Sequence, residues 1–430
     1  MPTTDLSARN IALEILGDVV NKRRSLDETL DGVSSRASLQ PRDLAFARHL
    51  VATTLRRLGQ IDALIDHGLE RPLPRKARPV RDLLRIGVCQ LLFMRTADHA
   101  AVDTAVSMAQ EAGLGPYKKL VNAILRRLQR EGAELLRVQN AARINTPDWL
   151  WQSWVSAYGD EMAQAIASAH LNEALLDIST TGDAAGWAEK LDARVLPTGS
   201  LRRDSGGAVT DLPGFGDGKW WVQDAAAWLV SGLLGDVAGQ RVIDLCAAPG
   251  GKTAALASKG AHVTAIDRSE NRLTRLGENL SRLNLKAEVI CADAVQWRPS
   301  EPTDMVLLDA PCSATGTIRR HPDIPHLKSV ADVERLAVLQ EKLLAAAMDM
   351  VKPGGAVVFC TCSLQPEEGP DQVEKFLAQA PDVQLDTITT AEVAGLSELI
   401  TADGVFRSLP CHLADLGGID GFYAARLRKQ

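Results

Sequence analysis

The 430-residue sequence has no long apolar run, and none approaches the roughly 18 to 20 apolar residues that a membrane-spanning helix needs. Residues 1–10 also lack the basic-then-apolar layout of a signal peptide. There are only seven cysteines, and apart from the Cys-x-Cys at Cys360 and Cys362 none has metal-site spacing. We therefore expect no disulfide framework, no bound metal and no membrane partner, and the reducing cytoplasm is the predicted compartment.

The sequence also lacks an overall basic excess, because its 48 Lys and Arg residues are outnumbered by 54 Asp and Glu residues. The charges are unevenly distributed, however. Residues 1–135 hold 21 Lys and Arg against 16 Asp and Glu, which leaves a net charge of −11 on the remainder. The basic residues cluster at 22–24, 71–85 and 118–130. Two interpretations stay open: a basic N-terminal face that meets a polyanion, or ordinary solvated helix faces.

The length predicts two or three domains. Residues 1–140 are predicted to form an all-α domain, since Leu50, Val51 and Leu55 follow a helical stripe and residues 83–92 are apolar nearly all round, as at the centre of a bundle. Residues 146–235 combine helical segments as far as about residue 171 with short strands and glycine turns. They are predicted to form a small α+β subdomain that connects the bundle to the rest of the chain.

Residues 236–430 are predicted to form a Rossmann-like α/β domain, because short apolar strands alternate there with longer helices. The strand candidates are residues 242–246, 263–267, 287–291, 305–308 and 356–360, and the helix candidates between them are residues 253–259, 270–283 and 332–350. This alternation predicts a parallel, doubly wound sheet. Functional residues in such sheets lie at the carboxyl ends of the strands.

Two cysteines follow strand candidates within turns rich in Pro, Ser and Thr: Cys312 in the segment 309–316 and Cys362 in the segment 361–363. A thiolate that adds to carbon 6 of a pyrimidine turns carbon 5 into an enamine nucleophile, which can accept a methyl group. Asp309 could hold the base during this reaction. The residues alone do not rank the two thiols. The other five cysteines are interpreted as small buried hydrophobic residues: Cys89, Cys246, Cys291, Cys360 and Cys411.

A glycine-rich turn follows the strand candidate 242–246, and Gly250-Gly251 lets backbone N–H groups approach a ligand closely. A Walker A phosphate loop would need glycine where Cys246 stands, which disfavours an ATPase. Asp267 ends the next strand, where a carboxylate can accept both ribose hydroxyls, and Asp293 follows the third strand and could accept an adenine amine. Together these residues indicate a nucleoside site and favour S-adenosylmethionine.

Three segments resemble a known family: DLCAAPGGKT at 244–253, DAPCSATGTIRRHPDI at 309–324 and TCSLQPEE at 361–368. They closely resemble the motifs of bacterial rRNA cytosine-C5 methyltransferases of the Fmu/Sun type, in the nucleolar-protein/Sun superfamily. The N-terminal helices resemble the NusB-like RNA-binding domain that the 16S-specific subgroup carries, and the ending at 421–429 resembles the family's last strand. The resemblance covers nearly the whole chain.

The resemblance implies that Cys362 is the nucleophile, that Cys312 assists product release and that Asp309 holds the cytosine. It also implies an S-adenosylmethionine site made of one turn and three acids: Cys246, Ala247, Ala248, Pro249, Gly250, Gly251 and Lys252, with Asp267, Asp293 and Asp309.

The implied product is 5-methylcytosine in 16S rRNA. A single-stranded or loop region is expected, because the base must leave its stack to react. Arg319, Arg320 and His321 could contact phosphates near the target. A monomer is expected. A tRNA substrate and a non-catalytic RNA-binding or antitermination factor are the alternatives.

Overall fold

The computed structural model describes residues 4–34, 40–94, 96–204 and 207–430, so residues 1–3 of the segment that lacks a signal-peptide layout lie outside it. The chain forms two compact units. Unit 1 comprises Met1–Asn172 with Ile318–Ser329, and unit 2 comprises Glu173–Thr317 with Val330–Gln430. The division at residues 172 and 173 differs from the predicted limits at 140 and 146, which stay predictions. Within the described ranges, no helix combines the length and apolarity of a membrane span.

Unit 1 is helical, as the sequence predicts. Its helices are α1 (Thr4–Lys22), α2 (Leu26–Ser34), α3 (Pro41–Arg56), α4 (Leu58–Gly68), α5 (Arg78–Leu92), α6 (Asp98–Glu111), α7 (Lys118–Arg137), α8 (Ala141–Ile144), α9 (Asp148–Tyr158), α10 (Asp160–His170) and the short α15 (Ile324–Leu327). Helix α5 packs against α3, α4, α6 and α7. Because it has neighbours all round, Leu83, Leu84, Ile86 and Val88 are fully buried, and the predicted centre of the bundle is confirmed.

A small antiparallel sheet opens unit 2, in the strand order β2-β3-β1-β4. Its elements are β1 (Leu176–Thr180), α11 (Ala184–Lys190), β2 (Arg194–Val195), β3 (Leu201–Arg203) and β4 (Trp220–Val222). A buried ion pair joins two of its strands, with Arg202 Nε 2.6 Å from Asp177 Oδ1. The predicted α+β character of this region is confirmed, but α9 and α10 belong to the helical unit.

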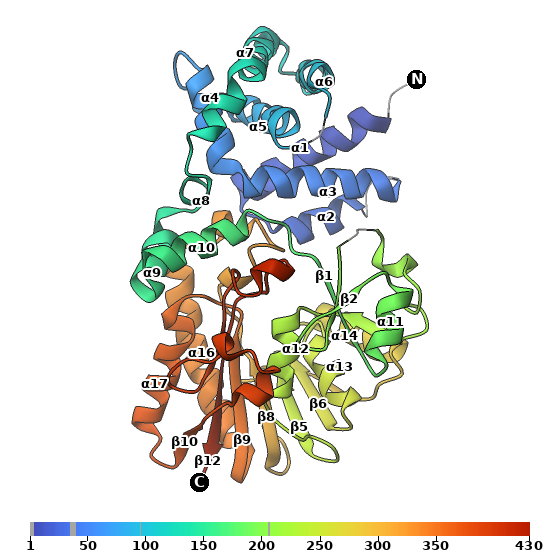
Figure 1. Ribbon diagram of the computed structural model, residues 1–430, viewed down its shortest axis with the longest axis vertical. Helices are drawn as coiled ribbons and strands as arrows, with labels where there is room; N and C mark the ends of the chain where they lie inside the picture. Colours follow the sequence, from blue (N-terminus) through green and yellow to red (C-terminus); the bar gives the residue numbers. More distant parts are fainter. Residues whose placement is uncertain (1–3, 35–39, 95, 205–206) are drawn as a thin grey trace. The chain divides into compact units, whose positions relative to one another are not determined.

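The large sheet of unit 2 has eight strands, with β10, β12, β9, β8, β5, β6 and β7 in that order and β11 paired with β12 (Figure 1). Its strands are β5 (Arg241–Leu245), β6 (His262–Asp267), β7 (Glu288–Cys291), β8 (Thr303–Asp309), β9 (Val351–Thr361), β10 (Val383–Asp386), β11 (Phe406–Ser408) and β12 (Phe422–Lys429). Strands β5 to β9 pair in parallel, whereas β12 runs antiparallel to its neighbours. The sheet is therefore mixed, and the expectation of a wholly parallel sheet is wrong at its C-terminal edge.

Helices cover both faces of this sheet: α12 (Ala225–Gly232), α13 (Gly251–Ser258), α14 (Glu270–Arg282), α16 (Val330–Met350) and α17 (Pro370–Gln379). Side chains alternate between the two faces along each strand, so Val242 joins one core with Leu229 of α12 while Ile243 joins the other with Leu344 of α16. Helix α16 ends at Met350, and Pro353, Gly354 and Gly355 lie within β9.

Candidate active site

The carboxyl ends of the parallel strands gather the predicted functional residues of unit 2. Asp309 ends β8 and lies opposite Cys360 of β9, while Asp267 ends β6. The backbone N–H of Ala310 donates to the Cys360 carbonyl at 2.9 Å, which keeps the chain beyond β8 beside the end of β9. Parallel pairing thus brings two segments about fifty positions apart in the chain to one edge of the sheet.

The two predicted cysteines meet at this edge. The Sγ atoms of Cys312 and Cys362 lie 3.5 Å apart in a thiol hydrogen bond, and both residues are half-buried. The Gly316 N–H donates to the Cys362 carbonyl at 2.9 Å and joins the two loops. The hydrogen bond to Cys362, together with burial, raises the pKa of Cys312 well above its ordinary value. Cys312 therefore keeps its proton at neutral pH and can donate it to the Cys362 sulfur.

The other five cysteines were predicted to be buried, and the structure confirms this for some of them and not for others. Cys89 and Cys360 are fully buried, and burial raises the pKa of Cys360 well above its ordinary value. Cys291 is exposed, since it ends the edge strand β7, so its predicted burial is wrong. Cys246 and Cys411 are half-buried. None of these five cysteines makes a described sulfur contact with Cys312 or Cys362.

Lys252 and Asp309 form an ion pair that the sequence did not predict, with Nζ 2.7 Å from Oδ2. Burial lowers the pKa of Lys252, but the Asp309 carboxylate and Cys360 raise it by more, so the pKa lies above its ordinary value. The ammonium also lies over the Phe422 ring, 5.0 Å from the centroid. Lys252 is therefore a fixed cation at the strand ends.

The glycine-rich turn between β5 and α13 depends on two left-handed backbone positions. Cys246 has φ 61° and Gly250 has φ 101°. A Cβ at Gly250 would lie 2.8 Å from Leu276 Cγ, so both its backbone and its surroundings require glycine there. Gly250 is also the N-cap of α13, so the turn directs the first N–H groups of that helix toward the strand ends.

Asp267 ties this turn to the next strand. Its Oδ2 accepts the Ala248 N–H at 3.3 Å, and its Oδ1 accepts the Ser269 N–H at 2.9 Å. Arg272 Nη1 lies 3.2 Å from Oδ2. Both Ala248 and Arg272 contact Oδ2, whereas Oδ1 keeps a second lone pair that a hydroxyl could use. Asp293 is exposed, and its Oδ1 accepts the Val295 N–H at 2.9 Å.

Two buried acids at this edge were missed by sequence reasoning. Asp244 accepts the Thr253 hydroxyl at 2.6 Å, while its Oδ1 has no partner among the described residues, and burial raises its pKa to about 7. Glu368 is fully buried beside the residues that follow the two cysteines. Both acids lie inside the motifs named above, but nothing in the sequence distinguishes them from exposed neighbours such as Glu367.

Comparison with known proteins decides the family. Residues 232–428 match the family described as 16S rRNA methyltransferase RsmB/F, and residues 6–130 match the NusB family. Ribosomal RNA small subunit methyltransferase B of Vibrio cholerae is 36% identical to this chain, and the match covers 99% of this chain and 98% of that protein. The chain belongs to the RsmB/F family of 16S rRNA methyltransferases. Its predicted class, an S-adenosylmethionine-dependent rRNA methyltransferase with a NusB-like N-terminal region, is confirmed.

Solved structures agree with this RsmB/F membership in fold. The structure of PH0851 covers 100% of this chain and 99% of its own, with a TM-score of 0.78 at 22% identity. NSun6 from Pyrococcus horikoshii, solved with SFG, covers 66% of this chain and 98% of its own, with a TM-score of 0.55 at 20% identity. At these identities the likeness shows the fold alone.

The basic segment after Cys312 does not lie as expected for a phosphate contact. Residues 318–329 belong to unit 1, where Asp323 Oδ2 accepts the Leu26 N–H at 2.9 Å. Arg319 is only 2% exposed, so the expectation that it contacts phosphates is wrong. His321 is half-buried, with Nδ1 3.5 Å from Asp27 Oδ2. For Arg320 and His321 a phosphate contact stays a prediction.

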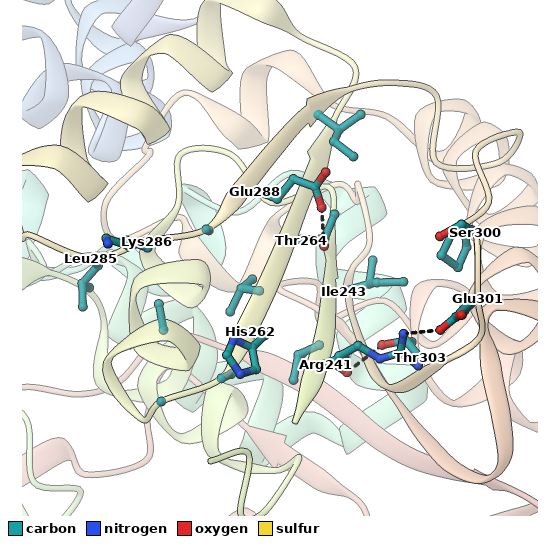
Figure 2. Close-up of a pocket in the computed structure, with 18 of the residues that line it drawn as sticks. Arg241, Ile243, His262, Thr264, Leu285, Lys286, Glu288, Ser300, Glu301 and Thr303 are labelled. Atoms are coloured by element: carbon teal, nitrogen blue, oxygen red, sulfur yellow. Dashed lines mark hydrogen bonds and ion pairs between the residues drawn. The ribbon is translucent and has the colours of Figure 1, made fainter. Parts of the chain in front are cut away.

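A large hollow lies at the opposite, amino-terminal ends of the strands of unit 2 (Figure 2). Its volume is about 840 Å³, and Arg241, His262 and Thr303, the first residues of β5, β6 and β8, line it. It is open because residues 292–302, all of them described, contain no helix to cover that part of the sheet. It holds none of the predicted site residues.

Proposed function

We propose that this RsmB/F-family chain methylates carbon 5 of a cytosine in 16S rRNA, with Cys362 as the nucleophile and Cys312 assisting release. The observation that carries the proposal is the pair of sulfurs 3.5 Å apart at the strand ends. Two thiols this close can act in succession on carbons 5 and 6 of a flipped cytosine. The fully buried Cys360, which precedes Cys362 by two residues, is unable to take either role.

The Cys362 sulfur adds to carbon 6, and the ring electrons of the 5,6 double bond shift toward carbon 5 as an enamine. S-Adenosylmethionine, when bound, would supply the methyl group from its sulfonium, whose sulfur would keep the electron pair of the broken bond and leave as a neutral thioether. Carbon 5 must then lose its proton to a base, after which the bond between sulfur and carbon 6 breaks and the double bond returns. The thiol proton of Cys312, which its raised pKa retains, is available to the departing Cys362 sulfur.

The charged pair at the strand ends supports the placement of the base. Asp309 is half-buried beside the cysteines, and Lys252 holds one of its oxygens at 2.7 Å. Among the described residues, only the weak thiol donor Cys360 approaches the second oxygen, with its Sγ 3.6 Å from Oδ1. A carboxylate fixed in this way can bind the polar edge of a cytosine, which is the role proposed for Asp309.

The turn and its acids fit S-adenosylmethionine. The turn from Cys246 to Lys252 offers backbone donors, and Asp267 Oδ1 keeps a lone pair for a ribose hydroxyl. The exposed Asp293 suits the adenine amine. No residue of the glycine turn presents a phosphate-binding Walker A arrangement, in keeping with a nucleoside rather than a nucleotide.

The helical unit supplies a cationic surface for RNA. Four exposed residues within eight positions, Arg71, Arg75, Lys76 and Arg78, have no described ion pair, whereas Arg81 and Arg85 in the same cluster pair with Asp62, Asp66 and Asp82. We assign phosphate binding to the four exposed residues and a structural role to the other two. A single-stranded or loop region is the proposed target, because the base must be extruded.

The test uses a Cys312→Ala variant incubated with 16S rRNA and S-adenosylmethionine and then separated on a denaturing gel. The expected result is a protein–RNA adduct that survives denaturation and disappears when Cys362 is also changed to Ala. If wild-type methylation occurs and neither variant gives an adduct, the assigned roles are wrong. If the wild type methylates tRNA and leaves 16S rRNA unmodified, the substrate is wrong, and absence of both activities would favour an RNA-binding factor.

A further inference from the structure

Glu368 is a fully buried acid. Its carboxylate oxygens accept hydrogen bonds from Ser313, Gln340 and Ser363. It lies in unit 2, at the end of a short 3₁₀ turn, Pro366–Glu368, that follows the loop of Cys362. Nothing in the proposed chemistry uses this carboxylate directly, because it is sealed from solvent. A buried acid that lacks a countercharge is costly unless its oxygens are well satisfied.

The donors come from both cysteine loops. The Ser313 N–H donates to Oε1 at 2.8 Å and to Oε2 at 3.1 Å, and the Ser313 hydroxyl also donates to Oε2. The Ser363 hydroxyl donates to Oε2 at 2.6 Å. Ser313 directly follows Cys312, and Ser363 directly follows Cys362. One carboxylate therefore binds the residue next to each thiol.

Helix α16 also holds this arrangement in place, through Gln340. Gln340 of α16 donates through Nε2 to Glu368 Oε1 at 3.2 Å and to the Pro311 carbonyl at 2.8 Å. The carboxylate accepts only, so all of these donors can point at it simultaneously. A glutamine of nearly the same shape would offer one oxygen and turn an NH₂ group toward a donor. The site is thus built for a carboxylate rather than for any polar side chain of that size.

We propose that Glu368 is a positioning residue that couples the two cysteines, holding Cys312 within reach of Cys362 so that product release follows attack. This inference rests on the proposed function, since it concerns the order of steps at that site. Burial raises the pKa of Glu368, while the hydrogen bonds from Ser313 and Ser363 oppose the shift. If the coupling is lost, Cys362 can still add to the base, but Cys312 no longer helps to release it.

The test compares Glu368→Gln with Glu367→Gln, the same substitution at the exposed neighbouring residue. For Glu368→Gln we expect kcat to fall about 10²-fold, as for a misplacement of about 1 Å, with KM for 16S rRNA within about twofold of wild type. A denaturation-resistant protein–RNA adduct should accumulate as it does in Cys312→Ala. Glu367→Gln should show the wild-type kcat and no excess adduct.

A milder variant guards against a folding defect. Ser363→Ala removes one donor and leaves the carboxylate in place, and it should also raise the adduct level, with a loss in kcat of about tenfold. If Glu368→Gln turns over at the wild-type rate, the inference is overturned. It is also overturned if both variants are folded and inactive with no adduct, or if both show lower adduct than wild type. The proposed function fails separately, when Cys312→Ala itself gives no adduct.

Discussion

The two ends of the same parallel strands in unit 2 differ sharply. The carboxyl ends hold the buried or half-buried ionisable groups Lys252, Asp309 and Asp244, and Glu368 lies buried beside the two cysteine loops. The amino ends hold an open hollow of about 840 Å³, with exposed ion pairs such as Arg241–Glu301 around it. In Figure 2 these side chains lie on the rim of an open sheet face. The proposed chemistry lies where ionisable groups are buried, not at this open hollow.

The physical reason is the cost of desolvation. A charged group that is removed from water must be paired or hydrogen-bonded, so a cluster of such groups exists only if the fold is arranged to hold it. An open hollow requires no such arrangement. Here it follows from the absence of a helix between β7 and β8 in the described chain.

The largest expected effect in this comparison is at Lys252. Lys252→Met leaves the half-buried Asp309 without its cation, so we expect methylation to fall at least about 10²-fold and the free energy of unfolding to fall by about 1–3 kcal/mol. Methylation is measured with labelled S-adenosylmethionine, and unfolding with urea. Lys259→Met, at the exposed far end of α13, is the matched control. Equal methylation activities of the two variants would show that Lys252 has no role in the proposed site.

Asp244 gives an intermediate effect that depends on pH. Burial raises its pKa to about 7, so the folded state binds the proton more tightly than the unfolded state. The resulting stability is fully present below about pH 4 and is lost as the pH rises to 7. Between pH 5 and pH 8, the unfolding free energy of wild type should therefore fall by roughly 2–3 kcal/mol relative to Asp244→Asn.

Urea unfolding at several pH values measures this difference, with Asp217→Asn at an exposed site as the control. Parallel pH profiles for wild type and Asp244→Asn would show that the Asp244 carboxyl titrates normally, and the contrast between the two ends of the sheet would weaken.

The smallest effect is expected at the amino ends. Arg241 and Glu301 are 3.0 Å apart but 51% and 73% exposed, so solvent screens their attraction. Glu301→Gln should change the free energy of unfolding by less than about 0.5 kcal/mol and leave methylation unchanged. A loss of activity of tenfold or more, with folding intact, would place a functional surface at this hollow and break the comparison.

The sequence predicted most of the fold because hydrophobic periodicity and turn residues act locally. The strand candidates 242–246 and 263–267 lie within one residue of β5 and β6, and the helix candidate 270–283 lies within one residue of α14. The expectation that both cysteines follow strand ends is also confirmed, since Cys312 follows β8 and Cys362 follows β9. The antiparallel pairing of β12 was not predicted, because a strand's own residues do not show the direction of its partner.

By itself, then, the sequence determined the order of elements, the glycine turn and the residue types at the strand ends. Only the tertiary structure decided which of those residues meet: Lys252 with Asp309, Cys312 with Cys362, and Glu368 with the serines beside both thiols. It also placed residues 318–329 in the helical unit and buried Arg319 there. The reason is that burial and pairing depend on contacts between segments far apart in the chain, and such contacts leave no local pattern in the sequence.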